Sequence, residues 1–555
     1  MRVLLLVSAF NALSQRVFCA LEDSGHEVSV EFAVDEAVML EAVTAWKPEL
    51  ILCPYLLKKV PETIWQKIPT LILHPGPVGD RGASSLDWAI LRQEREWGVT
   101  LLQANDEMDG GPVWGEGRFA MRQASKASLY RREVSDLALE LVQEALKNFE
   151  SPSFSPMPQE KLTPIHPPVR QSDRQIDWER DNTQTIIRKI NSADNRPGVL
   201  DEILGTHCYL FGAHEEGELR GVPKEVLAKR DGAICLGTVD GAVWISHLME
   251  PGRFKLPATF VLKKRLKGVK EERIPLYVDP SLQTFKEITF TQKGRVGYLG
   301  FDFYNGAMSA EQCVRLKYAV ETLREEVDVL VLKGGENFFS NGIHLTILED
   351  SKKRGEDGWS NINAMNNLIA SILFSDDILT VASFGANAGA GGVFLGLACD
   401  FAVAREGAVL NPHYKTLGLS GSEYHTYTLP LRVGEKKAKE LTEACLPVGA
   451  HRAKRLGMID AVFPSGGYDE ALSRWCEALV EDEDRYYDLL DAKRDLLERD
   501  AERIERCKEA ELERMYPEFW DESSDFHRLR HDFVYKVCPL KAPRRIARHR
   551  KDHDA

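Results

Sequence analysis

The stretch GAGGVFLGLACD, residues 389–400, is typical of a glycine turn that opens a buried helix. Such a turn directs bare backbone N–H groups toward a developing negative charge. The helix that follows supplies Val393, Phe394 and Leu395, with no titratable side chain before Asp400. The stretch therefore predicts an oxyanion-stabilising turn without the carboxylate that usually accompanies one.

Length and composition exclude several classes of protein. The 555 residues predict about three to four domains. A net charge of −14 argues against nucleic-acid binding in general. No segment approaches the roughly 18 apolar residues of a membrane span, and MRVLLLVSAF at the N-terminus predicts a buried strand, since it lacks a signal-peptide cleavage site. Ten scattered cysteines without a C-x-x-C pair predict no metal site and no disulfide framework, which fits a reducing cytoplasm.

The pattern of the chain changes twice, which predicts domains at residues 1–160, 161–275 and 285–555. The first domain alternates strands and helices, as in a parallel α/β sheet. A segment rich in proline and serine, residues 151–168, predicts a linker. The short strands after it predict a small OB-like β-barrel. Strands of the first domain are predicted at Val3–Val7, Val28–Phe32, Leu50–Cys53 and Thr70–Leu73.

The last domain is predicted to be a second α/β domain, with strands at 287–291, 296–301 and 327–332. It closes with a strongly charged helix at residues 485–515, which we interpret as a solvated structural element. The predicted fold class is therefore α/β, with a small β-barrel between two α/β domains.

The first domain has a histidine and an aspartate in positions that suit proton transfer. His74 ends a strand in LILHPGPVGDRGASSLDWAI, and Asp109 follows in a glycine-rich turn of VTLLQANDEMDGGPVWGEG. Sites in parallel α/β sheets lie at strand ends, and a carboxylate fixes the tautomer of a catalytic histidine. The alternative is that His74 only caps a turn and Asp109 only shapes a hairpin.

These motifs resemble the formyltetrahydrofolate-using family, which includes methionyl-tRNA formyltransferase. The resemblance rests on His74, RG at 81–82, WAI at 88–90, MDGG at 108–111 and INSADNRPGV at 190–199, and it covers about the first 270 residues. It implies that His74 and Asp109 are catalytic, that Arg81 and Gly82 contact substrate, and that 10-formyltetrahydrofolate is the formyl donor.

One position departs from that family. Its asparagine two residues before the histidine helps to hold the tetrahedral oxyanion, and Ile72 stands there in this chain. The departure puts transfer to the usual acceptor in doubt. Asn11, after the first strand, is the candidate substitute.

The second α/β domain resembles the crotonase, or enoyl-CoA hydratase, superfamily. The resemblance rests on VLVLKGGENFFSNGIHL at 329–345 and VASFGANAGAGGVFLGLACDFAVA at 381–404. It implies a crotonase fold and two backbone N–H groups, at Asn341 and Gly391, that hold an acyl-thioester oxygen. The alternative is that these glycines only allow close packing.

The two glutamates of a hydratase are missing at the matching positions. Phe394 and Tyr414 stand there, so hydration of a double bond is not expected. Tyr414 and Glu423 in NPHYKTLGLSGSEYH are the remaining candidates for proton transfer, with Phe394 lining the pocket. His344 is a weaker candidate. Each could equally be structural.

Joined modules of these two kinds indicate a relay: formyl passes from the folate to coenzyme A, and formyl-CoA then loses CO. The whole chain, including FNALSQR and HPGPVGDRG, resembles the HypX (HoxX) family of hydrogenase maturation factors. The resemblance implies a cytoplasmic enzyme that makes the CO ligand of nickel–iron hydrogenase and passes it to hydrogenase accessory proteins. Two alternatives are a formyltetrahydrofolate hydrolase that releases formate and a non-catalytic folate- and CoA-binding scaffold.

The C-terminal tail KAPRRIARHRKDHDA is a local exception to the acidic composition and is basic enough to meet phosphates. Arginine binds phosphate through paired, charge-assisted hydrogen bonds. We therefore predict that Arg544, Arg545 and Arg548 hold the phosphates of coenzyme A, the alternative being a disordered tail.

Overall fold

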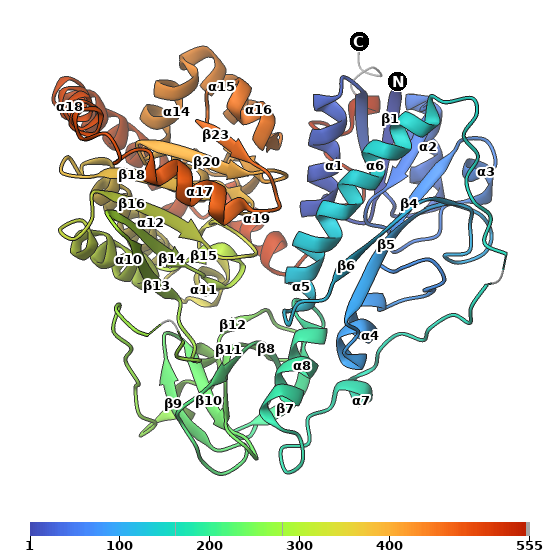
Figure 1. The fold of residues 1–555 in the computed structure, drawn as a ribbon, viewed down its shortest axis with the longest axis horizontal. Helices are drawn as coiled ribbons and strands as arrows, with labels where there is room; N and C mark the ends of the chain where they lie inside the picture. Colours follow the sequence, from blue (N-terminus) through green and yellow to red (C-terminus); the bar gives the residue numbers. More distant parts are fainter. Residues whose placement is uncertain (161, 280, 551–555) are drawn as a thin grey trace. The chain divides into compact units, whose positions relative to one another are not determined.

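The computed structural model describes residues 1–160, 162–279 and 281–550, and the chain forms two compact units (Figure 1). One unit contains residues 1–272 together with the chain from Cys538 onward, and the other contains residues 273–537. The predicted last domain, 285–555, therefore differs from the structure at its C-terminal end, because the tail packs on the first unit.

A six-stranded sheet in the order β2-β1-β3-β4-β5-β6 organises the N-terminal part of the first unit. The predicted parallel arrangement holds for β2, β1, β3 and β4, whereas β5 is antiparallel to both β4 and β6. Residues 3–7 are fully buried, as expected of a sheet covered on both faces. The strands are β1 (Arg2–Val7), β2 (Glu27–Phe32), β3 (Leu50–Cys53), β4 (Thr70–His74), β5 (Glu96–Gln103) and β6 (Val113–Ala120).

Helices cover this sheet. On one face, α2 and α3 pack on a core that includes Leu4, Leu6 and Ile51. The side chains of Asn11 and Asp35 cap the N-termini of α1 and α2. The helices are α1 (Ala12–Asp23), α2 (Glu36–Trp46), α3 (Glu62–Trp65), α4 (Ser85–Arg92), α5 (Lys126–Leu129), the π-helical turn Tyr130–Val134 and α6 (Ser135–Phe149).

The proline- and serine-rich segment is packed along the first unit and is not a free linker. Met157 forms a β-bridge with Val113, and His166 forms one with Gly82. The indole N–H of Trp88 donates to the carbonyl of Pro167 at 2.8 Å. These contacts hold residues 163–167 beside the predicted His74 site.

The next module is a sheet of short antiparallel strands in the order β7-β8-β11-β10-β9, with β12 beside β11. Among the described residues these ladders form an open path, without a pairing of β7 to β9. The apolar faces of the strands and of α8 share one core. The elements are α7 (Gln171–Arg174), α8 (Thr183–Ala193), β7 (Val199–Ile203), β8 (Thr206–Glu216), β9 (Val226–Arg230), β10 (Ala233–Gly237), β11 (Ala242–Met249), β12 (Leu256–Pro257), α9 (Ala258–Leu262) and the 3₁₀ turn η2 (Lys263–Leu266).

The second unit is built on a six-stranded sheet in the order β13-β14-β16-β18-β20-β23. All its neighbouring strands are parallel except β13 and β14. The strands are β13 (Ile288–Lys293), β14 (Val296–Phe301), β16 (Val329–Gly334), β18 (Leu379–Phe384), β20 (Phe401–Arg405) and β23 (Ala461–Phe463). Short ladders join β15 (Ala307–Met308) to β17 (Gly342–Ile343), and β19 (Ala388–Gly389) to β21 (Val409–Asn411) and β22 (Val448–Gly449).

Ten helices of the described chain belong to this unit. They are α10 (Ala310–Leu323), α11 (Leu345–Asp350), α12 (Arg354–Leu373), α13 (Gly391–Leu397), α14 (His425–Val433), α15 (Glu435–Ala444), α16 (Ala450–Arg455), α17 (Tyr468–Glu477), α18 (Glu483–Trp520) and α19 (Asp525–Val534). Short 3₁₀ turns are η3 (Tyr304–Gly306) and η4 (Lys415–Leu417), and η5 (Arg548–Arg550) lies in the tail of the first unit.

The charged helix α18 is longer than predicted and is more than a solvated element. One stripe of it is buried, including Tyr486, Ile504, Met515 and Phe519. Glu511 on the same stripe is fully buried. A buried carboxylate requires hydrogen-bond donors around it, and these come from the second candidate site.

Two predicted absences concern membranes and metals. None of the helices in the described part of the chain is long and apolar enough to cross a membrane. The same residues hold no cluster of three or more potential metal ligands.

Candidate functional sites

The first site lies around His74 at the end of β4. The imidazole of His74 is buried, its Nε2 lies 2.8 Å from Oδ2 of Asp80, and its Nδ1 lies 3.6 Å from Oδ1 of Asp109. The ring therefore stands between two carboxylates, which fix its orientation. This geometry suits the transfer of a proton.

Asp80 is a candidate site residue that the sequence interpretation missed, although it lies within the quoted motif HPGPVGDRG. Burial acts to raise the pKa of Asp80, but hydrogen bonds from His74 and Ser85 and the nearby His166 lower it overall. Nε2 of His166, from the segment predicted as a linker, is 3.6 Å from Oδ1 of Asp80. A Cβ on Gly76 would come within 2.3 Å of Asp80 Oδ2, so glycine is needed at that position.

Asp109 lies beside His74, but it does so from the loop between β5 and β6 and not from the predicted strand end. Because β5 is antiparallel to β4, its last residue Gln103 pairs with Leu71, away from His74. The loop between β5 and β6 then returns, and Asp109 adopts a left-handed conformation with φ of 51°. Its Oδ2 accepts the backbone N–H of Gly82 at 2.9 Å, which holds the carboxylate beside the histidine.

Arg81 and Gly82, predicted to contact substrate, stabilise the walls of this site. The guanidinium of Arg81 is buried and donates to Met108 O at 2.7 Å, Thr163 O at 2.9 Å and Glu107 Oε2 at 3.0 Å. Gly82 has φ of 108°, and a Cβ there would lie 2.5 Å from the carbonyl oxygen of His166. Both residues join the Asp109 loop to the neighbouring segment, so a direct role toward substrate stays a prediction.

Ile72 and Asn11 do not form an evident substitute for the missing family asparagine. The side chain of Ile72 packs against the core under α2 and α3. The side-chain oxygen of Asn11 accepts the backbone N–H of Ser14 at 3.0 Å and so caps α1. The two roles are explained by packing and capping, and the part of Asn11 in formyl transfer remains a prediction.

The second site forms where α13 begins. Gly391 is its first residue, and its backbone N–H has no intrahelical acceptor by position. Ala390 before it has φ of 47°, an unfavourable conformation for alanine that sets the direction of the turn. A Cβ on Gly342 would lie 3.2 Å from the nitrogen of Gly391, and a Cβ on Gly391 would lie 2.8 Å from Glu423 Oε1. The two glycines therefore let β17, the N-terminus of α13 and the carboxylate of Glu423 approach one another closely.

The predicted role of Asn341 as an oxyanion donor is wrong in this structure. Its backbone N–H donates to the carbonyl of Gly306 at 2.7 Å. Its side-chain amide donates to the carbonyl of Asn305 at 2.8 Å. Asn341 thus ties its own loop to residues 305–306, and the oxyanion role of Gly391 stays a prediction.

Tyr414 and Glu423 form a buried hydrogen-bonded pair. The hydroxyl of Tyr414 donates to Oε2 of Glu423 at 2.6 Å, and the two side chains are 7% and 1% exposed as residues. Burial raises the pKa of Glu423 above its ordinary value, although hydrogen bonds from Tyr414 and Ser422 oppose this. Burial and the charge of Glu423 raise the pKa of Tyr414 far above its ordinary value. Glu423 can therefore act as a base, and Tyr414 stays protonated.

An aromatic layer covers this pair. The ring of Phe394 stacks on Tyr414 with centroids 5.5 Å apart and planes 13° apart. His425, which the sequence interpretation missed, contacts both rings at 5.4 and 5.3 Å. The layer replaces the polar groups with which a hydratase would bind water.

His344 has a structural role. Its Nδ1 accepts the backbone N–H of Ile347 at 3.4 Å and so caps α11. Burial lowers the pKa of His344 to about 4, which keeps the ring neutral at physiological pH. A neutral capping histidine is not suited to the catalytic part considered for it.

The basic tail covers the open edge of β2. The backbone N–H of Val30 donates to Ile546 O at 3.0 Å, and Glu31 accepts from Ala542 N at 2.8 Å and from the side chain of Arg550. The tail is therefore docked through residue 550 and not disordered. Arg548 donates to Glu22, so its charge is already paired. Arg544 is exposed and Arg545 is half-buried.

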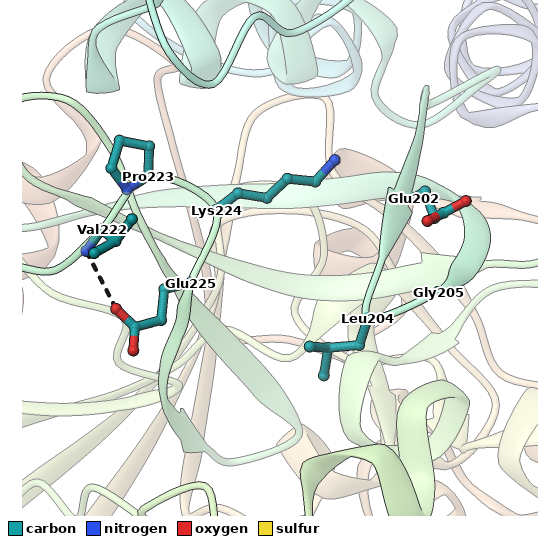
Figure 2. Close-up of a pocket in the computed structure, with 7 residues that line it drawn as sticks. All are labelled: Glu202, Leu204, Gly205, Val222, Pro223, Lys224 and Glu225. Atoms are coloured by element: carbon teal, nitrogen blue, oxygen red, sulfur yellow. Dashed lines mark hydrogen bonds between the residues drawn. The ribbon is translucent and has the colours of Figure 1, made fainter.

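The β-module carries a separate hollow of about 580 Å³ (Figure 2). Glu202, Leu204, Gly205, Val222, Pro223, Lys224 and Glu225 line it. Glu225 accepts the backbone N–H of Val222 at 3.2 Å, and Lys224 pairs with Asp201 at 2.8 Å. None of the predicted site residues lies there.

Comparison with known proteins gives the family. The hydrogenase maturation factor HoxX of Bradyrhizobium diazoefficiens is 40% identical over 559 residues, which cover 99% of this chain and 97% of that protein. The chain belongs to the HypX/HoxX family of hydrogenase maturation factors. The crystal structure of HypX from Aquifex aeolicus in complex with tetrahydrofolic acid is 44% identical, with a TM-score of 0.97 and full coverage of both chains.

Single modules match as well. Residues 168–265 match the model of the formyl transferase C-terminal domain, and residues 303–533 match that of enoyl-CoA hydratase/isomerase. Methionyl-tRNA formyltransferase of Thermus thermophilus is 26% identical over 227 residues, which cover 40% of this chain and 73% of that enzyme. The predicted combination of a formyltransferase-like and a crotonase-like module in a HypX/HoxX protein is confirmed.

Proposed function

We propose that this HypX/HoxX protein is a cytoplasmic two-site enzyme that makes carbon monoxide for hydrogenase maturation. The first site transfers formyl from 10-formyltetrahydrofolate to the thiol of coenzyme A, and the second converts the formyl thioester to CO and free thiol. One observation carries the proposal: the buried Glu423–Tyr414 pair faces the glycine turn of α13 under an aromatic layer.

At the first site the reaction requires one proton to move. The acceptor thiol loses its proton, the C–N bond of the formyl amide breaks, a C–S bond forms, and the folate nitrogen gains a proton. His74 carries that proton, with Asp80 at 2.8 Å and Asp109 at 3.6 Å orienting the ring. The folate bound to the Aquifex aeolicus relative supports the choice of donor.

At the second site the chemistry is limited by the substrate. A formyl thioester has no α-carbon, so neither hydration nor enolate formation is available to it. The N–H of Gly391 polarises the carbonyl oxygen, and Glu423 removes the formyl proton. The electrons of that C–H bond become the lone pair on the carbon of CO. The C–S pair leaves with the thiolate, and an oxygen lone pair completes the triple bond. Tyr414 donates a hydrogen bond that guides the return of the proton to the thiolate.

Exclusion of water decides between CO and formate. Phe394 is fully buried and Glu423 is 1% exposed. A pocket without water suppresses attack on the polarised carbonyl, which would yield formate. This feature favours release of CO over hydrolysis.

The residues present fit the thioester end of coenzyme A, because Gly391 begins α13 and its backbone N–H has no intrahelical acceptor, close to the carboxylate of Glu423. Coenzyme A supplies a thiol that accepts the formyl group and leaves again. For the coenzyme A that accepts formyl at the first unit, we retain Arg544 and Arg545 as candidates for binding the phosphates, and the pairing of Arg548 with Glu22 argues against the third arginine.

Incubation of the purified protein with 10-formyltetrahydrofolate and coenzyme A, with a haem protein to trap CO, tests the proposal. We expect the haem spectrum of the CO adduct, and no adduct when coenzyme A is omitted. Release of formate alone would favour a hydrolase, and consumption of no donor would favour a binding scaffold.

A further inference from the structure

The loop that carries Glu423 has an unfavourable backbone conformation. Gly421 has φ of 100°, and Glu423 and Tyr424 have φ of 63° and 55°. Two successive non-glycine residues in the left-handed region persist only where surrounding contacts hold them. The contacts that fix this turn also fix the direction of the Glu423 side chain.

Glu511 of α18 holds the turn from behind. Its Oε2 accepts the backbone N–H of Tyr424 at 2.9 Å. Its Oε1 accepts the backbone N–H of Thr426 at 2.7 Å and the hydroxyl of Thr426 at 2.6 Å. Nδ1 of His425 lies 3.2 Å from the same oxygen. Glu511 is fully buried, so this carboxylate is dedicated to the loop and has no contact with solvent.

Two further contacts complete the support. The side-chain oxygen of Asn366 accepts the backbone N–H of Glu423 itself at 2.9 Å. Oε2 of Glu518, two turns along α18, accepts the backbone N–H of Ser420 at 2.9 Å. Of these, Glu511 alone contacts the residues directly after Glu423 and places a charge beside the site.

We infer that Glu511 is a positioning residue for the second reaction: it fixes the strained turn of Glu423 and sets the electrostatic field at that carboxylate. The inference rests on the proposed function of Glu423. It also gives α18 a functional role in place of the structural role expected from its sequence.

The charges around Glu423 come from four elements. Tyr414 precedes η4, His425 begins α14, Glu511 lies on α18, and the thiol of Cys313 on α10 is close enough to be affected by Glu423. The charge of Glu511 acts to raise the pKa of Glu423, whereas His425 acts to lower it. Removing the charge at 511 should therefore lower the pH at which Glu423 loses its proton.

Glu511→Gln tests the inference, because an amide cannot accept from both backbone N–H groups. Its oxygen can face one, and its NH₂ group must then face the other. We expect CO release from synthetic formyl-CoA to slow about 100-fold, with kcat affected more than KM, because a base displaced by about 1 Å loses that much. We also expect the acid limb of the pH profile to move to lower pH.

The matched control is Glu513→Gln on the exposed side of the same helix, which should behave as the wild type. Thr426→Val removes only the 2.6 Å hydroxyl contact and should lower kcat by a smaller factor, so it decides the matter if Glu511→Gln does not fold. A wild-type kcat and pH profile in Glu511→Gln would overturn the inference. A loss of kcat that only follows a loss of thermal stability, with an unchanged pH profile, would overturn it as well. Absence of CO from the wild type would instead overturn the proposed function.

Discussion

Two effects act on the pKa of Glu423 in opposite directions: burial raises it, and the hydrogen bond from Tyr414 lowers it. Glu423 is a carboxylate with a raised pKa, and it accepts a hydrogen bond from Tyr414 at 2.6 Å. Burial strengthens it as a base, and the tyrosine keeps one of its oxygens directed away from Gly391. The other oxygen, Oε1, lies beside Gly391, where the proposed function places the formyl hydrogen.

The pH dependence of CO release follows from that pKa. Only the deprotonated carboxylate can accept the formyl proton, so the rate should fall as pH drops through the pKa of Glu423. Because burial raises this pKa, the acid limb should lie above the ordinary value of 4.5. Initial rates of CO release from formyl-CoA at a series of pH values check this, and a rate that stays constant down to pH 4.5 would contradict it.

Substitution at the same pair should separate the two reactions. Glu423→Gln and Tyr414→Phe should consume formyl-folate at the wild-type rate but release CO about 100-fold more slowly or less, since general acid–base groups contribute that much. Glu443→Gln, at a half-exposed position in the same unit, is the control. Normal CO yield from the Glu423/Tyr414 double variant would show that another group removes the proton.

Asp80 makes a corresponding prediction for the first site. Asp80→Asn keeps the size of the side chain but removes the charge 2.8 Å from His74 Nε2. Consumption of formyl-folate should slow by about 100-fold, while CO release from formyl-CoA should not change. Asp106→Asn, in the exposed part of the Asp109 loop, controls for the loss of a nearby charge. An equal loss of formyl-folate consumption in both variants would show that Asp80 has no specific role toward His74.

The sequence predicted those helices and strands whose position follows from a local pattern of residues. The run of buried residues 3–7 is β1, and the glycine run at 389–392 opens α13. The direction of β5 could not be read in this way, because an isolated apolar strand has the same pattern in either orientation. The role of Asn341 was also out of reach, since it depends on a hydrogen bond to Gly306, 35 residues earlier in the chain.

Contacts over long separations account for what the sequence missed. Glu511 lies 87 residues after Tyr424, within a helix whose other glutamates are mostly exposed. Nothing in the local pattern distinguishes it from them. Asp80, only six residues from His74, was within reach, because a carboxylate in a tight turn after a catalytic histidine can return to its ring.

The docked tail carries a prediction about stability. Truncation after Leu540 removes Ala542, His549 and Arg550 from Glu31 and uncovers the edge of β2. We expect the first unit to lose about 2–4 kcal/mol of unfolding free energy at neutral pH. Burial acts to raise the pKa of Glu31, but hydrogen bonds from His549 and the backbone lower it overall.

The sign of the pH dependence checks that explanation. A carboxyl with a lowered pKa contributes stability above its unfolded value of 4.5, and the contribution is lost as pH falls through its folded value. The difference between truncated and full-length protein in denaturant titrations should therefore shrink at acid pH. An equal difference at every pH would attribute it to apolar contacts alone. Because truncation destabilises the unit, Arg544→Ala is the cleaner test of phosphate binding.

For the whole molecule, the two candidate sites belong to different compact units, each with its own sheet and core. Under the proposed function, the His74 site acts on folate without Glu423, and the Glu423 site acts on a formyl thioester without His74. The central claim is that one chain carries out two reactions linked only by formyl-CoA.

The most direct measurement supplies synthetic formyl-CoA, without folate, to the wild type and to His74→Ala, with a haem protein as the CO trap. We predict CO at equal rates from both proteins, and none from His74→Ala when 10-formyltetrahydrofolate and coenzyme A replace formyl-CoA. Failure of the wild type to release CO from formyl-CoA, under conditions where it releases CO from the folate, would contradict the account.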